Sequence, residues 1–472
     1  MLFYEPLFLF VFLPTFYLLY LAFERGYWAR LGVILFGSFV FYEWSDPLFP
    51  LLVLASSLAD WVIARAIARF PRGAAGAKVL LTLGILLNLA MLVHFKYTHF
   101  VIENLNVMLT GFSWKALENP LIALPVGVSF VVFEKITYLV DVYRRISRPA
   151  RNLFNYLTYV FFFPKLLAGP IIKYHEMEAQ LAALPAARWD DISDGFSRFM
   201  LGIVKKALIA DTVGLGVDRI FAADPHAIGF ADAWLGVVLF TFQIYFDFSA
   251  YSDMAIGIAR MLGFRLRENF NMPYLSCSMT EFWRRWHISL ATWIRDYLYI
   301  PLGGNRVPVA RRYLNLWVCF LASGLWHGAA WPYVVWGAYN GLFLVLDKLF
   351  LLRVLDRMPR LAANLLTFFV VMVGWTIFRA RSLDQAGAFF SAMLQPGLAG
   401  RAAGVFVTPD ITFAAALAAF ICAVPRLPGY DRLRRAAFAS PGRVTAVRTA
   451  IALAFVLAVG KAVADPFTPF LY

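Results

Sequence analysis

The sequence predicts an all-α polytopic membrane protein. Of its 472 residues, 61% are hydrophobic and only 15% are charged, whereas about a quarter of an average soluble domain is charged. Apolar runs long enough to cross a hydrocarbon core of about 30 Å recur along the whole chain. The Lys and Arg residues behind the net charge of +14 cluster between these runs, which indicates membrane orientation rather than nucleic-acid binding. We expect lipid surroundings, no soluble domain and no nucleic-acid partner.

The N-terminal part predicts five crossings, because loops rich in Lys and Arg alternate with loops that contain almost none. The run 3–22 has no basic n-region and no small-residue cleavage site, so it predicts a retained span rather than a signal peptide. Placing the basic loops in the cytoplasm puts the N-terminus outside. The expected spans are 3–22, 31–45, 48–68, 79–97 and 119–142, and the basic-poor loops are 44–47 and 98–118.

The next apolar run is interrupted. Pro164 and Gly169-Pro170 break the segment 153–175, and non-helical backbone at membrane depth must be buried in protein or line a cavity. We therefore predict a re-entrant hairpin at 153–175, followed by a cytoplasmic amphipathic link at 175–194.

Most of the remaining chain again predicts membrane spans, but one segment does not. Residues 265–312 interleave charges and aromatic rings, which predicts helices lying in the membrane interface. The expected spans are 196–221, 231–262, 313–330, 333–352, 362–380, 409–425 and 449–465. We expect about 11 to 13 membrane segments in total. We expect them to form a single membrane domain, 1–472, made of N-terminal spans (1–152), the hairpin (153–175), a central core that contains the His287 and His327 motifs (195–352) and C-terminal spans (353–472).

The side chains able to perform chemistry are few. The three cysteines, Cys277, Cys319 and Cys422, lie far apart with no metal-type spacing, so we expect neither a metal site nor disulfides. Four of the six histidines fall in predicted loops or at segment ends: His94, His99, His175 and His226. His287 and His327 do not.

His327 lies in SGLWHGAAW, fifteen residues beyond Arg312. That spacing is about 22 Å of helix, which places the imidazole past the bilayer midplane before Trp331-Pro332 turns the chain back. An ionisable group inside a membrane is a functional-site hypothesis. The alternative is a neutral imidazole hydrogen-bonded to a neighbouring helix.

His287 lies in EFWRRWHISLATWIRDYLYIPLGG. At helical spacing it shares a face with Trp283 and Trp286. The segment is either an interfacial anchor or part of a site, and Asp296 with the turn at 301–304 favours the site.

Two carboxylates, Asp247 and Asp253, fall in the apolar run 245–264. Carboxylates in such a run must pair, hydrogen-bond or face water. We expect structural ion pairs, with Arg284, Arg285 or Arg295 as the partners.

Together these segments resemble the membrane-bound O-acyltransferase superfamily, in particular its bacterial alginate O-acetyltransferase-like branch. The stretches that carry the resemblance are LPVGVSFVVFEKITYLVDVYR (124–144), FFFPKLLAGPI (161–171), YFDFSAYSDMAIGIARMLGF (245–264), the segment around His287, SGLWHGAAW and GWTIFRA (374–380). The resemblance spans most of the chain.

The resemblance implies transfer of an acyl group from a thioester to a hydroxyl inside a central funnel or tunnel. It implies that His327 is the essential catalytic residue and His287 the second polar residue of the site. A histidine suits general-base catalysis near neutral pH. We expect no metal and no permanently bound cofactor. The expected lining residues are Trp283, Trp286, Trp326, Asn340 and Asp296.

The resemblance further implies acetyl-CoA as the donor, reached from the cytoplasm, and an extracellular or cell-wall polysaccharide as the acceptor. Candidate contacts to the donor's phosphates are Lys165, Lys173, Arg284, Arg285 and Arg306. We expect a partner in the periplasm, an SGNH-type acetyltransferase or another polysaccharide-modification protein, and a location in the bacterial inner membrane. Lys165 departs from the family pattern, in which an uncharged polar residue is expected.

Several alternatives stay open at this point. One is D-alanyl transfer to a teichoic acid-type polymer, and another is acylation with a fatty chain. From a different class, the chain could be a proton-coupled transporter or flippase that uses His327 and Asp247 as proton relays. The last is a scaffold without activity.

Overall fold

The computed structural model describes residues 1–472 except 24–25, 45–46, 225–226, 399, 401–405 and 465–472. Outside those gaps the chain forms helices and loops, with no β-strand, which confirms the all-α prediction. The packing divides the chain into two compact units, residues 1–196 with 255–267 and residues 197–254 with 268–472. Each unit is described by itself below.

Among the residues that the structure describes, six helical stretches are long and apolar enough to cross a membrane, so the protein is a multi-pass membrane protein. They are α3 (Phe49–Arg69), the continuous stretch Ala75–Gly111, α12 (Phe230–Met261), α18 (Arg360–Arg379), the stretch Pro409–Arg426 that begins with α20 (Pro409–Ala423), and α22 (Pro441–Ala464). A shorter apolar helix covers Phe8–Ala22. Membrane passage of the other expected segments, and the funnel, remain predictions.

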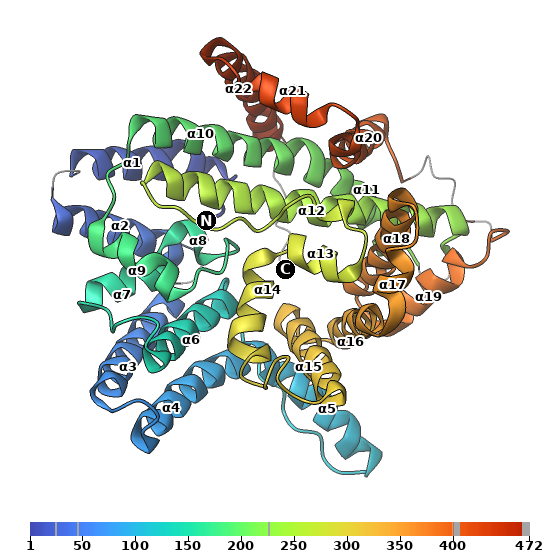
Figure 1. Cartoon of the computed structure of the whole chain (residues 1–472). Coiled ribbons are helices and arrows are strands. Elements are labelled where there is room, and N and C mark those ends of the chain that lie inside the picture. Colours follow the sequence, from blue (N-terminus) through green and yellow to red (C-terminus); the bar gives the residue numbers. More distant parts are fainter. Residues whose placement is uncertain (24–25, 45–46, 225–226, 399, 401–405, 465–472) are drawn as a thin grey trace. The chain divides into compact units, whose positions relative to one another are not determined.

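The first unit is built from α1 (Leu13–Ala22), α2 (Tyr27–Glu43), α3, α4 (Ala75–Leu92), α5 (Thr98–Gly111), α6 (Val128–Arg144), α7 (Leu153–Phe161), α8 (Phe163–Leu166) and α9 (Tyr174–Ala183), with parts of α10 (Trp189–Val204) and α12. Helices α3, α4 and α6 pack against one another, and α2 packs against α7 (Figure 1). The break expected at Pro164 is present, because α7 ends at Phe161 and α8 follows as a single short turn.

Buried ion pairs hold α6 in this unit. Lys135 Nζ lies 3.2 Å from Asp60 on α3. Lys165 pairs with Glu134, and both side chains are almost completely buried. This pair disfavours Lys165 as a contact for a donor phosphate, because its ammonium group already has a buried partner.

Two predicted boundaries in this unit are also wrong. The stretch 98–118 was expected to be a loop, but the helix continues to Gly111, since no proline or internal glycine interrupts it. The span expected at 119–142 begins only at Val128. Pro120 and Pro125 disfavour helix before that point, and Gly127 adopts a left-handed conformation with φ of 80°.

The second unit contains α11 (Asp211–Ala222), α13 (Met279–Arg285), α14 (Ile288–Ile294), α15 (Val309–His327), α16 (Trp331–Leu346), α17 (Leu352–Leu355), α18, α19 (Leu383–Met393), α20, α21 (Tyr430–Ala437) and α22, with the remaining parts of α10 and α12. Its core is rich in aromatic side chains from α12, α13, α16 and α18.

The hairpin of α15 and α16 is the tightest helix pair of this unit, and the two helices run side by side in Figure 1. Two glycines allow this approach. A Cβ atom on Gly337 would collide with the Phe320 carbonyl oxygen, and one on Gly324 would collide with the Tyr333 carbonyl oxygen. Because backbone meets backbone here, the hairpin holds the end of α15 in a fixed position.

Candidate active site

His327 is the last residue of α15, and Gly328 leaves the helix with an extended backbone. Its partly exposed ring lies edge-on to three aromatic rings. The centroid distances are 4.9 Å to Trp326, 5.2 Å to Trp336 and 5.3 Å to Phe378. The imidazole is therefore held by packing at the mouth of the α15–α16 turn.

His287 lies in the turn between α13 and α14, with φ of 43°. A residue other than glycine rarely adopts this left-handed conformation, and such residues cluster at functional sites. Its side chain is buried, and the ring lies 4.6 Å from Phe248 and 5.9 Å from Trp326. The strained turn thus directs an imidazole into the aromatic core.

The two histidines face one another within this unit. Their ring centroids lie 6.4 Å apart. Both ring nitrogens of His287 are buried, and neither has a hydrogen-bond partner among the residues that the structure describes. Buried polar atoms are nearly always paired, so His287 has hydrogen-bonding capacity to offer a bound group.

The three tryptophans expected to line the site lie at different distances from it. Trp326 contacts both histidines. Trp283 lies 5.7 Å from Trp336 and so forms part of the wall behind His327. Trp286 packs at 4.9 Å against Trp375, one ring further away.

Sequence reasoning missed four aromatic residues of this enclosure: Phe248, Trp336, Trp375 and Phe378. The stretches that carry the resemblance contain three of them: Phe248 lies in residues 245–264, and Trp375 and Phe378 lie in GWTIFRA. Trp336 lies in none of these stretches.

Asn340 and Asp296 are bonded elsewhere. Asn340 is buried on α16 and donates to the Trp336 carbonyl oxygen at 2.8 Å. Asp296 accepts from the Arg295 guanidinium at 2.6 Å, in the π-helical turn that follows α14. A contact of either residue with substrate remains a prediction.

The other histidines have local roles where they are described. His99 pairs with Glu103 at 2.9 Å on an exposed helix face, and His94 is exposed beside Phe95. His175 Nδ1 lies 2.8 Å from Asp141 Oδ2. His226 lies outside the described residues. Within the described ranges, no three His, Cys, Asp or Glu side chains converge as metal ligands do.

Asp247 and Asp253 form ion pairs, but the partners predicted for them are wrong. Asp247 pairs with Lys206 at 2.9 Å, and Asp253 pairs with Lys205 at 2.8 Å. Asp253 also pairs with Arg198 at 2.9 Å.

The physical reason lies in how α10 packs. Gly202 lets α10 approach α12 closely, against Ala250 and Met254. The cations that follow in sequence are thereby brought to the two aspartates. Two of the arginines predicted as partners pair with neighbours instead, Arg285 with Glu281 and Arg295 with Asp296, and Arg284 is exposed.

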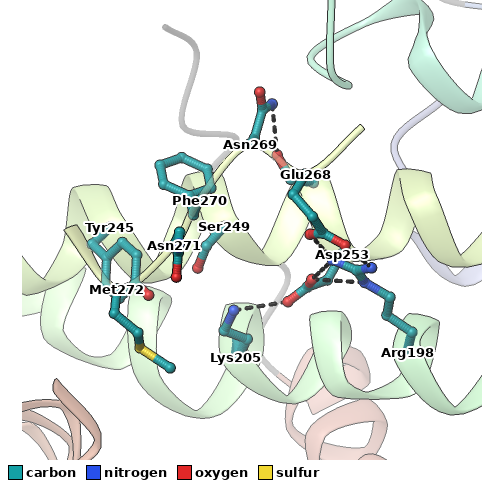
Figure 2. A pocket seen from close by; sticks show the side chains of 11 residues that line it. Arg198, Lys205, Tyr245, Ser249, Asp253, Glu268, Asn269, Phe270, Asn271 and Met272 are labelled. Carbon is teal, nitrogen blue, oxygen red and sulfur yellow. Dashed lines mark hydrogen bonds and ion pairs between the residues drawn. The ribbon is translucent and has the colours of Figure 1, made fainter. Parts of the chain in front are cut away.

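Beside this network lies a polar pocket of about 180 Å³ (Figure 2). Its walls include the Asp253 ion pairs and the segment that precedes α13. The lining residues are Arg198, Lys205, Tyr245, Ser249, Ser252, Asp253, Glu268, Asn269, Phe270, Asn271 and Met272. Phe270 also packs 5.1 Å from Phe248, the ring that covers His287.

Comparisons with known proteins show what the chain is similar to. Residues 85–383, a range that contains both histidines, match the model of the membrane-bound O-acyltransferase family. The chain is 42% identical over 402 residues to the probable alginate O-acetylase AlgI of Azotobacter vinelandii, across 84% of this chain and 79% of that protein. It is 35% identical over 421 residues to the peptidoglycan O-acetyltransferase of Helicobacter pylori, across 82% and 78%. It is 26% identical over 277 residues to the teichoic acid D-alanyltransferase of Bacillus subtilis, across 54% and 68%.

Proposed function

The chain belongs to the membrane-bound O-acyltransferase family and is an O-acyltransferase; from that premise, we propose that it passes an acetyl group from acetyl-CoA in the cytoplasm across the membrane for O-acetylation of an extracellular or cell-wall polysaccharide. The observation that carries the proposal is the pair of imidazoles 6.4 Å apart within one aromatic enclosure. Relatives named as an alginate O-acetylase and a peptidoglycan O-acetyltransferase support the acetyl group and the class of acceptor.

His327 is the general base in this proposal. An alcohol attacks a thioester poorly until a base within hydrogen-bond reach takes its proton. The acceptor oxygen bonds to the thioester carbonyl carbon while its proton passes to His327. The C–S bond then breaks, and the proton goes from the imidazolium to the leaving thiolate, which departs as the thiol. The acetyl ester is the product, and no cofactor is consumed.

His287 polarises the thioester carbonyl. Neither of its ring nitrogens bonds to a described protein group. This disfavours the other possible role of His287, in which it would orient His327 through a direct hydrogen bond. One N–H of the neutral ring is therefore available to the carbonyl oxygen. A donor in a dry, preorganised site stabilises the negative charge that develops on that oxygen. The surrounding tryptophan and phenylalanine rings exclude water from the reaction.

The partner and location follow from the acceptor. The proposal places the protein in the bacterial inner membrane with its N-terminus in the periplasm. There an SGNH-type acetyltransferase, or another polysaccharide-modification protein, receives the acetyl group and places it on the polymer. The exposed Arg284 and Arg306 remain candidates for the phosphates of acetyl-CoA.

D-alanyl transfer is the second candidate function, because the chain also resembles a teichoic acid D-alanyltransferase. That relative is less similar and is matched over a smaller share of this chain. The transporter alternative loses support from the fixed pairing of Asp247 with Lys206, and from the family itself.

The donor is tested with protein reconstituted in nanodiscs. Radiolabelled acetyl-CoA and a D-alanyl carrier-protein thioester are each supplied with a periplasmic fraction, and release of thiol and transfer of label are followed. We expect turnover with acetyl-CoA only. Turnover with the D-alanyl thioester alone would replace the proposal with the second candidate, and uptake without transfer would support a transporter.

A further inference from the structure

The turn that carries His287 needs an external support. Its left-handed backbone is unfavourable for a residue with a Cβ atom. No hydrogen bond from its ring to a described residue compensates for this penalty. The support is therefore to be sought in the backbone around the turn.

The segment Asn269–Asn271 supplies that support by running alongside the turn. Asn271 N donates to the Arg285 carbonyl oxygen at 2.9 Å, before His287. After it, Ile288 N donates to the Asn269 carbonyl oxygen at 3.0 Å. Two backbone hydrogen bonds to the non-helical segment Asn269–Asn271 therefore flank His287, one before it and one after it.

The Asn269 side chain adds two hydrogen bonds of its own to this backbone support. Its Oδ1 accepts from Ser289 N at 3.3 Å, so it satisfies an amide in the first turn of α14. Its Nδ2 donates to Ser252 Oγ on α12 at 3.1 Å. The side chain is only 1% exposed, and Figure 2 shows Asn269 on the wall of the polar pocket beside α12. One amide therefore ties the His287 turn to the long helix that also presents Phe248.

We propose that Asn269 is a positioning residue for His287: it holds the left-handed turn so that the imidazole faces the reacting carbonyl. The inference rests on the proposed function, because it assumes that His287 acts on the substrate. Asn269 itself touches no reacting atom. Its loss displaces the ring without emptying the site, and a small displacement of a catalytic group lowers the rate more than it lowers binding.

The test compares Asn269→Ala with Asn271→Ala, an asparagine two residues away with an exposed side chain whose backbone pairing survives the change. Initial rates of acetyl transfer from acetyl-CoA are measured for the full-length chain in nanodiscs. We expect kcat of Asn269→Ala to fall roughly tenfold or more, with KM for acetyl-CoA nearly unchanged. Asn271→Ala should retain wild-type kcat.

A double-mutant cycle separates positioning from general support of the fold. If Asn269 acts through His287, adding Asn269→Ala to His287→Ala should cause no further loss. An additional tenfold loss in that background, or wild-type kcat for Asn269→Ala alone, would overturn the inference.

Two further measurements apply if Asn269→Ala does not fold or if the proposed acetyltransferase function is wrong. If Asn269→Ala does not fold, Ser252→Ala removes the other end of the same hydrogen bond. It should give a smaller loss in kcat that also vanishes in the His287→Ala background; wild-type kcat would overturn the inference. A wild-type protein that ignores acetyl-CoA refutes the proposed function and the inference with it. An active wild type that His287→Ala impairs and Asn269→Ala leaves unchanged refutes the inference alone.

Discussion

His287 and His327 meet with 6.4 Å between their ring centroids, although a turn, two short helices and most of α15 separate them in the sequence. Trp326 contacts both rings, at 5.9 Å and 4.9 Å. Different structural features therefore position the two imidazoles: a left-handed turn positions His287, and the tight α15–α16 hairpin positions His327. The turn and the hairpin each lead to a separate prediction.

Replacement of His287 should depend on what the new side chain can donate. His287→Ala removes the donor, and loss of one preorganised donor lowers kcat by about 10²- to 10³-fold. His287→Asn keeps an N–H donor and tolerates the left-handed backbone, so it should retain more activity. Rates of acetyl transfer check this order. Equal activity of both variants with wild type would contradict the role of His287.

The α15–α16 hairpin should not tolerate a methyl group at Gly337. The added Cβ would meet the Phe320 carbonyl oxygen, and overpacking of this kind destabilises by about 1 to 3 kcal/mol. We expect a lower unfolding temperature for Gly337→Ala together with reduced activity. Gly387→Ala on α19 is the matched control, because a Cβ atom there meets nothing within 4 Å. The prediction is contradicted if both variants unfold at the wild-type temperature.

The buried pair of Lys165 and Glu134 should behave as one unit. Removing one partner leaves an uncompensated buried charge and destabilises by about 3 to 5 kcal/mol. Lys165→Met should therefore unfold well below wild type. The double variant Lys165→Met with Glu134→Gln should recover much of the loss, since neither charge remains. Thermal unfolding in detergent measures both, and equal destabilisation of the single and double variants would contradict the pairing.

The stability of the first unit should depend on pH through His175, on the short helix α9 outside the six candidate spans. Its hydrogen bond to Asp141 raises the pKa of His175 above the ordinary value of 6.5. A group whose pKa is raised on folding contributes its stabilisation below the unfolded pKa, and that stabilisation is lost as pH rises through the folded pKa.

The measurement is the difference in unfolding temperature between wild type and His175→Gln from about pH 5 to pH 9. Wild type should hold its advantage at low pH and lose it above neutrality. The effect should be small, because the His175 side chain is 32% exposed and exposed pairs contribute little. A difference that grows with rising pH would contradict the assignment.

Local sequence features located the two histidines better than they located the residues that contact them. The motifs around His287 and His327 were recognisable because each places an imidazole among tryptophans within a few residues. Phe248 was missed because α12 is separated in sequence from both histidines. Trp336 was missed although α16 directly follows α15, because no periodicity shows which faces of two helices meet. The partners of Asp247 were missed for the same reason, although the adjacent Lys205 and Lys206 in an apolar run were a signal.

The predicted helix boundaries were wrong where the local sequence allows both a helix and a loop. Residues 98–111 lack the Lys and Arg of a cytoplasmic loop, which predicts an outer loop, yet nothing in them stops a helix. The left-handed turn at His287 was also beyond prediction. Histidine adopts this conformation more often than most residues other than glycine, yet still rarely. Asn269, which supports the turn, lies on a separate segment.

The most direct test of the central claim is the rate of acetyl transfer from acetyl-CoA by His327→Ala, with the exposed His94→Ala as the matched control. If His327 is the general base, the variant remains folded and loses about 10²- to 10⁴-fold in kcat, while His94→Ala matches wild type. A folded His327→Ala protein that transfers acetyl groups at the wild-type rate would contradict the account.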